Sequence, residues 1–597
     1  MKNTEKSASK MYSRTEWNLD LLYTNATDPA LERDVKSYEK ACDAFEKKYK
    51  NSDEYLKIDT ALASALSAYE TLSGHIGGSK PIIYFYYRTA LNALDQEADS
   101  QINQLSQRLT KAANKTLFFE LSLSTLSKDQ QKNFLKSALL EHFRYFLERV
   151  FDTAKYNLSE PEEKIMNLKS LPSHSMWIQG QEKLLNQQTV LYKGKQIPFP
   201  EAQNMFSQLP IKERHALADT MSMTLKKISH FAESELNAVI TNKKINDELR
   251  GFKQPYSGTI LGYQNDEKSI LNLVSTVTKN FPISHRFYAV KAKMLKLKNF
   301  EYSDRAAKVG NVSIKPSFEE SVEILRSAFS KANPEYKKIL DSYLEKGQID
   351  VYPKKGKRGG AFCSSNVDTP TYVFLNHVNS LDSLKTFAHE MGHAIHAEFS
   401  KTQTPLYQGH TISVAEVAST LFENFAFAEI FPRLSDKEKV IALHDRISDA
   451  ISTIFRQIAC FNFELELHQT VRAAGAISKE DIAKLHNKHM HAYLGPKFKM
   501  KEDDGYFFVQ WPHIRSFFYV YSYAYGELIS TALYKKYKEE PGYIQKIEEF
   551  LKAGGSMSPE DIFKSIGVDT SKPEFFEAGL KQIEEDIIKL EKLVSKM

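Results

Sequence analysis

Residues 381–396 read LDSLKTFAHEMGHAIH, and this stretch decides how the whole chain is interpreted. Its apolar residues recur at intervals of three and four, at Leu384, Ala388, Met391 and Ile395. This spacing predicts a helix that buries one apolar stripe. His389 and His393 lie four residues apart on roughly the opposite side, so both imidazoles can bind one metal ion.

Glu390 completes an HExxH motif, HEMGH at 389–393. It sits beside the first histidine but points away from the metal axis, so it can act as a base toward water without binding the metal. The alternative is a surface helix with two solvated histidines. The apolar stripe and the small Gly392 instead favour a helix packed into a cleft.

A catalytic zinc ion has three protein ligands and one open position, so a third ligand is needed. A histidine six residues after His393 would mark the metzincin class, but Phe399 stands there and excludes it. His396 is too close on the same helix to share the ion, and we interpret it as a supporting or structural residue.

Glu416, within SVAEVASTLFEN at 413–424, is the favoured third ligand. Twenty-two residues separate it from His393, enough for a second helix to run beside the first. The alternative is that Glu416 closes a capping box with Ser413. Glu423, two turns further on, is a candidate to orient a metal-bound histidine through its other nitrogen.

The composition excludes several classes of protein. The chain has 597 residues, of which 42% are hydrophobic and 26% charged, and its net charge of +5 gives no support to nucleic-acid binding. Three cysteines are too few for a disulfide framework. We find neither a secretory apolar run near residue 1 nor a membrane-spanning stretch, and therefore expect a cytoplasmic protein.

Helix signals dominate the chain, with little sheet. We expect an N-terminal helical domain over residues 1–200 and a mostly helical catalytic domain over 201–597. A small sheet is expected near 350–376, where a glycine-rich loop leads into a strand at 371–375. That strand is expected to offer an exposed edge to an extended peptide, and the loop at 356–360 to close over it.

Further motifs join HEMGHAIH (389–396) and AEVASTLFENF (415–425): TEWNLDLLY (15–23), GKRGGAFC (356–363), YVFLNHVNSL (372–381) and WPHIRSFFYVYSYAYG (511–526). Together they resemble the thimet-oligopeptidase-like zinc metallopeptidases, and within that family the oligoendopeptidase F group. The resemblance covers most of the chain and is most specific over 356–526.

The resemblance implies a mainly α fold, a two-lobed helical ellipsoid that encloses a deep channel, with a small β-sheet beside the HExxH helix. It implies a zinc metalloendopeptidase that hydrolyses internal bonds of short unfolded oligopeptides. One zinc ion per chain would be held by His389, His393 and Glu416, with Glu390 as the general base. Neither nucleic acid nor membrane is an expected partner.

In this family a histidine and a tyrosine of the 511–526 stretch donate hydrogen bonds to the substrate carbonyl. By position these are His513 and either Tyr521 or Tyr523. Read without the resemblance, the run is ambiguous: the alternating tyrosines suggest a strand, whereas residues 527–537 suggest a helix. A packing role is favoured for the tyrosines. The chain departs from the family pattern at Arg515, where an aromatic residue is expected, and at Tyr525, where threonine is usual.

Two other functions stay open. A zinc exopeptidase, either a dipeptidyl carboxypeptidase or an aminopeptidase, can use the same HExxH and glutamate, although no GxMEN-like stretch precedes HEMGH. A noncatalytic helical peptide-binding scaffold is the second alternative, and the presence of Glu390 argues against it.

Overall fold

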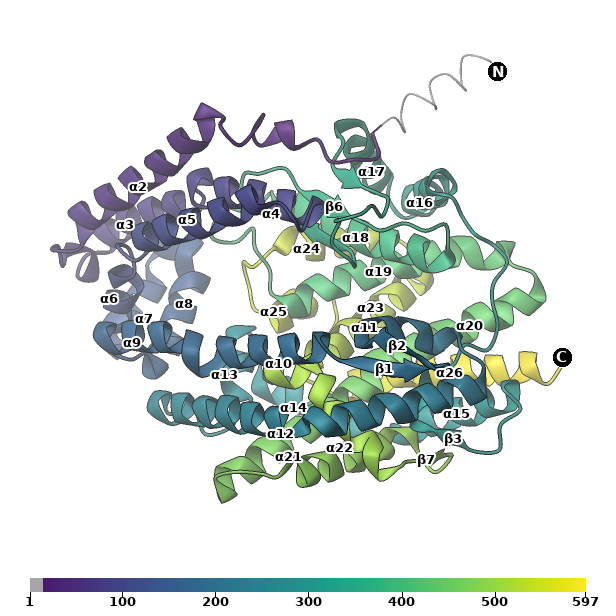
Figure 1. The fold of residues 1–597 in the computed structure, drawn as a ribbon. Helices are drawn as coiled ribbons and strands as arrows, with labels where there is room; N and C mark the ends of the chain where they lie inside the picture. Colours follow the sequence, from purple (N-terminus) through teal and green to yellow (C-terminus); the bar gives the residue numbers. More distant parts are fainter. Residues whose placement is uncertain (1–13, 597) are drawn as a thin grey trace, which may run out of the picture. The chain divides into compact units, whose positions relative to one another are not determined.

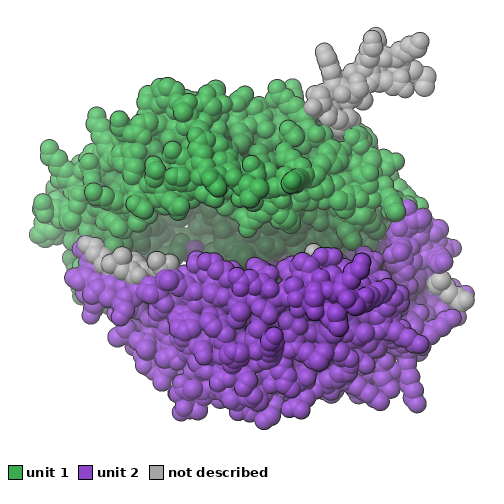
Figure 2. All heavy atoms as spheres, in the orientation of Figure 1, with its two compact units in different colours: residues 1–157, 314–433, 533–566 green, residues 158–313, 434–532, 567–597 purple. Residues whose placement is uncertain are grey.

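The computed structural model describes residues 14–596, leaving aside the side chains of Lys164, Asn167, Leu168, Leu171, Asn204 and Ser207. The described chain is mostly helical, as the sequence predicts (Figure 1). It forms two compact units, each built from three stretches of chain and coloured separately in Figure 2. The stretches of the two units alternate along the sequence. The division into an N-terminal domain and a catalytic domain at residue 200 stays a prediction.

Unit 1 comprises residues 14–157, 314–433 and 533–566. Its helices are α2 (Pro29–Tyr49), α3 (Asp59–Ser73), α4 (Lys80–Leu91), α5 (Gln96–Ala113), α6 (Phe118–Ser124), α7 (Lys128–Lys136), α8 (Arg144–Thr153), α16 (Phe318–Ala332), α17 (Pro334–Lys346), α18 (Leu381–Ser400), α19 (Ile412–Ile430), α24 (Tyr543–Ala553) and α25 (Pro559–Ser565).

A three-stranded sheet packs against α18 within unit 1, close to the predicted position. Its strands lie in the order β4 (Ile349–Asp350), β6 (Tyr372–Phe374) and β5 (Phe362–Ser364). β6 pairs in parallel with β4 and antiparallel with β5. The expectation of an exposed edge on the 371–375 strand is therefore wrong, because β6 is central and β5 is the edge strand on the side facing away from β4.

The segment around Trp17 belongs to the core beneath this sheet. The indole Nε1–H of Trp17 donates to the carbonyl of Val373 at 2.8 Å, and its backbone N–H donates to Asp350 at 3.1 Å. Its ring lies 5.4 Å from that of Tyr372 and 5.3 Å from that of Phe374. Through these contacts the TEWNLDLLY motif, near the start of the chain, packs against the sheet that lies beside α18.

The glycine-rich loop before β5 is tied down within unit 1. Gly356 has a φ of +85°, and its carbonyl accepts from the N–H of Ala93 at 2.7 Å. Lys357 is buried and pairs with Asp350 at 2.6 Å. Asn376 donates to the carbonyl of Gly360 at 2.8 Å. These anchors leave the loop far less free to close than the sequence suggested.

Unit 2 comprises residues 158–313, 434–532 and 567–596. Its helices are α9 (Glu160–Ser170), α10 (Met176–Asn186), α11 (Phe199–Met205), α12 (Ile211–Arg250), α13 (Ser257–Gly262), α14 (Glu267–Lys279), α15 (Phe281–Met294), α20 (Asp436–Ala450), α21 (Gln457–Ala474), α22 (Lys479–Leu494) and α26 (Pro573–Val594). Its strands are β1 (Thr189–Tyr192) with β2 (Lys195–Pro198), and β3 (Phe300–Glu301) with β7 (Phe498–Lys499). Helix α23 (Tyr521–Glu539) begins in unit 2 and ends in unit 1.

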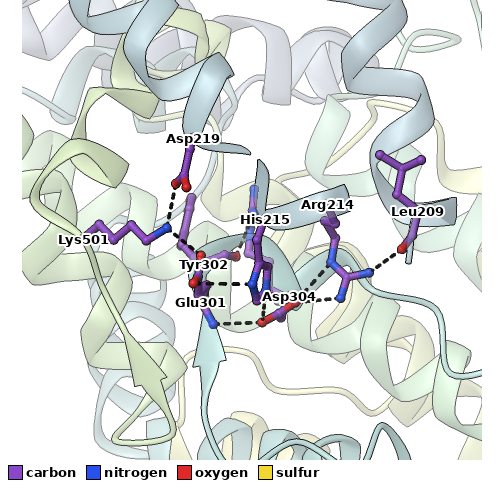
Figure 3. Close-up of polar contacts among 9 residues, drawn as sticks. Leu209, Arg214, His215, Asp219, Glu301, Tyr302, Asp304 and Lys501 are labelled. Atoms are coloured by element: carbon purple, nitrogen blue, oxygen red, sulfur yellow. Dashed lines mark hydrogen bonds and ion pairs between the residues drawn. The ribbon is translucent and has the colours of Figure 1, made fainter. Parts of the chain in front are cut away.

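A buried carboxylate joins α12 to the segment after β3 (Figure 3). Asp304 is fully buried and accepts from Arg214 Nε and Nη2 at 3.1 and 2.7 Å. It also contacts His215 Nε2 at 2.9 Å and accepts from the backbone N–H of Glu301 at 2.9 Å. Lys501 pairs with the Glu301 side chain at 2.8 Å. A buried guanidinium is stable here because a carboxylate neutralises it.

Among the helices of the described chain, none combines the length and the apolar character needed to cross a membrane. The cytoplasmic location stays a prediction.

Candidate metal centre

Helix α18 carries the HExxH motif and packs directly against α19, as predicted. Ser380 caps α18 by accepting the N–H of Ser383 at 3.1 Å. Gly392 allows the two helices to come close. A Cβ atom at this position would lie 2.8 Å from the Cα of Ser419 and 3.0 Å from the Cβ of Phe422. The motif therefore sits at a tight helix–helix contact, and any larger residue at 392 would force the helices apart.

Three side chains converge from these two helices. One ligand atom from each of His389, His393 and Glu416 can be chosen so that all lie within 4.8 Å of one another. His389 Nε2 is 3.7 Å from Glu416 Oε2, and the two imidazole rings are 4.9 Å apart. One zinc ion, with bonds of about 2.0–2.2 Å, fits such a set of two nitrogens and one oxygen after small side-chain rotations.

Glu416 is free to take part because it does not cap its helix. α19 begins at Ile412 with Thr411 as the N-cap residue, and no side chain caps it. The hydroxyl of Ser413 instead contacts that of Thr411 at 3.0 Å. The capping-box alternative for Glu416 is therefore wrong, and its carboxylate faces His389.

Glu423 holds the first histidine in place. Its Oε1 lies 2.6 Å from His389 Nδ1, which leaves Nε2 of the same ring toward Glu416. Lys385, one turn before His389 on α18, lies 3.3 Å from the other oxygen of Glu423. Carboxylates in this position fix the tautomer and orientation of metal-binding histidines.

His396 has a different role from the two histidines of the motif. It is fully buried, and its ring stacks on that of His410 at 3.8 Å with an interplanar angle of 11°. His410 lies just before α19, in the segment that leads to Glu416. This stack packs the connection between the two helices, consistent with the structural role expected of His396.

Glu390 is the buried acid beside these three residues, with only 6% of its surface exposed. The backbone N–H of Cys363 on β5 lies near enough to the carboxylate to lower its pKa slightly. Burial, opposed by the charge on His389 and assisted by that on Glu416, raises the pKa of Glu390 to about 7. A carboxyl group with a pKa near neutrality suits proton transfer in both directions.

The second predicted group lies in unit 2, around His513. His513 Nδ1 is 2.5 Å from the hydroxyl of Tyr519, and the ring of Tyr523 lies 6.0 Å away. Burial and, to a smaller extent, the charge of Arg456 together lower the pKa of His513 to about 4. The imidazole is therefore neutral at pH 7, and with Nδ1 accepting from Tyr519 its Nε2–H is available as a donor.

Tyr521 lies apart from this pair. It is fully buried, and its hydroxyl donates to Asn265 at 3.0 Å. The strand expected for the tyrosine run is wrong, because Tyr521 starts helix α23. Helical geometry then places Tyr523 and Tyr521 on different faces, so that one lies near His513 and the other in the core.

The backbone between His513 and Tyr519 is strained and held by buried groups. Phe517 and Phe518 have φ of +49° and +61°, which side chains other than glycine rarely adopt. The N–H of Phe518 donates to the fully buried Glu464 at 2.8 Å. Such strain persists only where the surroundings enforce it.

Arg515 provides a second anchor. It forms a buried bidentate pair with Glu235 at 2.8 and 2.7 Å and also donates to the carbonyl of Trp511 at 2.9 Å. This accounts for the departure from the aromatic residue expected at this position.

A model of peptidase family M3 matches residues 212–582, more than half of the chain. The chain belongs to peptidase family M3. A second model, for oligopeptidase F, matches residues 123–189 of this M3 peptidase. It is therefore a metallo-oligopeptidase, an enzyme that hydrolyses peptides.

Curated relatives agree with this assignment. Oligopeptidase PepF of Bacillus subtilis is 27% identical over 503 residues. The match covers 82% of this chain and 74% of the relative. An oligoendopeptidase F homologue of Borreliella burgdorferi is 25% identical over 586 residues, covering 93% and 94% of the two chains. These M3 relatives confirm the resemblance to oligoendopeptidase F.

Solved structures share the fold. A peptidase of Chlamydophila abortus matches with a TM-score of 0.84 and 23% identity over 97% of this chain and 98% of its own. Oligoendopeptidase F of Enterococcus faecium matches with a TM-score of 0.69 and 19% identity over 95% and 98%. The mainly α architecture predicted from the sequence is thus shared with these two solved structures.

Replacing Glu423 by glutamine should weaken metal binding about 10- to 100-fold, because the amide orients His389 less firmly than the carboxylate does. Competition of the purified variant against a zinc-buffering chelator measures this. Glu429→Gln on the same helix is the matched control, since Glu429 pairs with the exposed Lys331 and Arg433 and not with a residue of the centre. If both variants bound zinc as tightly as wild type, Glu423 would have no role in holding the metal.

Proposed function

We propose that this M3 peptidase is a zinc-dependent endopeptidase that cleaves internal bonds of short unfolded oligopeptides. The observation that carries the proposal is the convergence of His389, His393 and Glu416, with Glu390 beside them. Two imidazoles and a carboxylate are a donor set that suits zinc. Within residues 14–596 this is the one such group found, which supports one metal ion per chain.

In the proposed mechanism, His389 and His393 would hold the metal from α18 and Glu416 would hold it from α19. When bound, zinc lowers the pKa of water toward about 7 and polarises the substrate carbonyl. Glu390 accepts the proton of the attacking water and then passes it to the amine that leaves. Its position next to a ligand, buried against β5, keeps the carboxyl close to the reacting atoms and shielded from bulk water.

His513 is proposed to donate a hydrogen bond to the substrate carbonyl as negative charge develops on it. Support comes from the family resemblance and from its hydrogen-bonded tyrosine. The roles of Tyr521 and Tyr523 stay predictions, and the geometry adds Tyr519 as the tyrosine in contact with His513. Such donors act where charge develops in the transition state.

Replacing Tyr519 by phenylalanine should lower kcat about 10- to 100-fold with a smaller change in KM, because His513 loses the hydroxyl that fixes its tautomer. Tyr521→Phe is the matched control, since it removes a hydroxyl that pairs with Asn265 in the core. Steady-state kinetics on one quenched peptide compares them. A larger loss of kcat in Tyr521→Phe would assign the role to Tyr521.

The edge strand β5 is proposed to align the substrate. An extended peptide can pair with the free edge of Phe362–Ser364 through main-chain hydrogen bonds, which make little demand on its sequence. Strand β5 packs against α18, the helix that carries Glu390, so an aligned peptide would lie beside the general base. The channel that would restrict substrates to short peptides stays a prediction from the family resemblance.

A peptide blocked at both ends distinguishes the candidate functions. We expect wild-type enzyme to cut it internally and a chelator to stop the cleavage, with added zinc restoring it. Mass spectrometry of the products identifies the cleaved bond. Cleavage only of peptides with a free terminus would establish an exopeptidase, and binding without cleavage would establish a scaffold.

A further inference from the structure

Arg305 and Arg456 of unit 2 lack the carboxylate partner that other buried arginines of this unit have. Arg214 pairs with Asp304, and Arg515 pairs with Glu235. Within the described part of the chain, no carboxylate lies within the 4.0 Å of an ion pair from the guanidinium of Arg305 or Arg456. Both are half-buried, so their charges are only partly solvated.

The two guanidinium groups flank the same aromatic ring. Arg305 lies 5.3 Å and Arg456 5.7 Å from the ring centre of Phe507. Arg305 also stacks on Tyr302 at 4.1 Å, and Arg456 on Trp511 at 5.0 Å. Aromatic faces hold a guanidinium in a fixed plane but leave its N–H groups free to donate.

Several buried donors next to these arginines have no acceptor. Arg456 Nε and Trp511 Nε1 are both buried without a hydrogen-bond partner, and each can only donate. Neither nitrogen of the fully buried His486 has a partner, and its ring lies 5.7 Å from that of Trp511. Arg456 Nε and Trp511 Nε1 can only donate, so neither can satisfy the other, and an anion bound beside them would supply an acceptor to both.

The local charge is positive. Asp504 is the acid that faces Arg305, and burial raises its pKa to about 6. One of its oxygens is already used by the backbone N–H of Lys501 at 2.7 Å. Two guanidinium charges against one partly committed carboxyl group favour an anionic acceptor over a neutral one.

We propose that Arg305 and Arg456 form a subsite that binds a carboxylate group of the peptide substrate. The subsite adjoins His513, whose ring lies 6.2 Å from that of Trp511 within the same unit. Guanidinium groups bind carboxylates through paired hydrogen bonds. The carboxylate can be the peptide's C-terminus or an acidic side chain, which share this chemistry. The proposal rests on the peptidase function, because the ligand is its substrate.

The test measures equilibrium binding by calorimetry to chelator-treated protein, so that it does not depend on cleavage. One peptide pair ends in a carboxylate or a carboxamide, and a second pair carries glutamate or glutamine internally. We expect wild type to bind one carboxylate form at least tenfold more tightly than its amide. Arg456→Gln and Arg305→Gln should lose that preference while binding the amide form within twofold of wild type.

Arg286→Gln is the matched control, since it removes the same charge from unit 2 at a site where Arg286 pairs with Glu584 and Glu591. It should keep the preference. Which peptide pair is discriminated identifies the source of the carboxylate. If Arg456→Gln does not fold, as judged by its thermal transition, Arg456→Lys replaces it and should lose most of the preference.

Three results would overturn the subsite. Wild type could fail to discriminate either pair, or the variants could weaken both members of a pair equally. Added chloride could also tighten the binding of all four peptides to the same extent. The cluster would then bind a free inorganic anion and not a carboxylate of the peptide. Failure of wild type to cleave any peptide would instead contradict the proposed function and leave the binding comparison valid.

Discussion

Glu390→Gln is expected to abolish peptide cleavage, by a factor of about 1,000 or more in kcat, while the protein keeps its metal. Glutamine has nearly the shape of glutamate and should keep its place beside the ligands, but it cannot take a proton from water. General base catalysis contributes about 10² to 10⁴ in rate, so its loss is large. Quenched-peptide kinetics together with metal analysis of the same sample measure both quantities.

Glu398→Gln serves as the control for this variant. Glu398 lies on the same helix, two turns further on, where it accepts from Tyr343 at 2.7 Å and pairs with Lys401. It should cleave peptides within a few-fold of wild type. Cleavage by Glu390→Gln at the wild-type rate would mean that another group is the base.

His389→Ala is expected to lose both metal and activity. Removing one of three ligands leaves too few donors to hold zinc in a tetrahedral site. It also leaves Glu423 without the imidazole that it contacts at 2.6 Å. Metal analysis after dialysis should find less than a tenth of the wild-type content, and cleavage should fall to the same extent.

His410→Ala is the control for His389→Ala, because it also removes a buried imidazole of unit 1 without removing a proposed ligand. It is expected to lower thermal stability through the lost stacking with His396, yet to retain metal when folded. Full metal content in His389→Ala would show that the ion binds elsewhere.

Local patterns predicted the two helices that bring the candidate ligands together. The HEMGH spacing and the apolar stripe placed His389 and His393 correctly on α18, and the distance in sequence allowed α19 to bring up Glu416. Glu423 was a candidate because it lies two turns after Glu416, and it contacts His389. These features depend on helix periodicity, which a sequence displays directly.

Features that depend on distant contacts could not be predicted. Which strand is central depends on β4, a two-residue strand with no recognisable pattern of its own. The partner of Arg515 is Glu235, 280 positions away in the sequence. Neither pairing leaves a local signal.

The tyrosine run was misread for a related reason. Alternation suggested a strand, but two residues with positive φ precede Tyr519, and a helix begins at Tyr521. Phenylalanine gives no hint of a left-handed conformation, so the turn was invisible in the sequence. The same turn brings Tyr519 to His513, a contact that the sequence reading missed.

The most direct test of the metal centre is anomalous X-ray diffraction at the zinc absorption edge from crystals of zinc-loaded protein. The account predicts one anomalous peak per chain, about 2.0–2.2 Å from nitrogens of His389 and His393 and an oxygen of Glu416. A peak bound by other residues, or no peak in enzyme that still cleaves peptides, would contradict it.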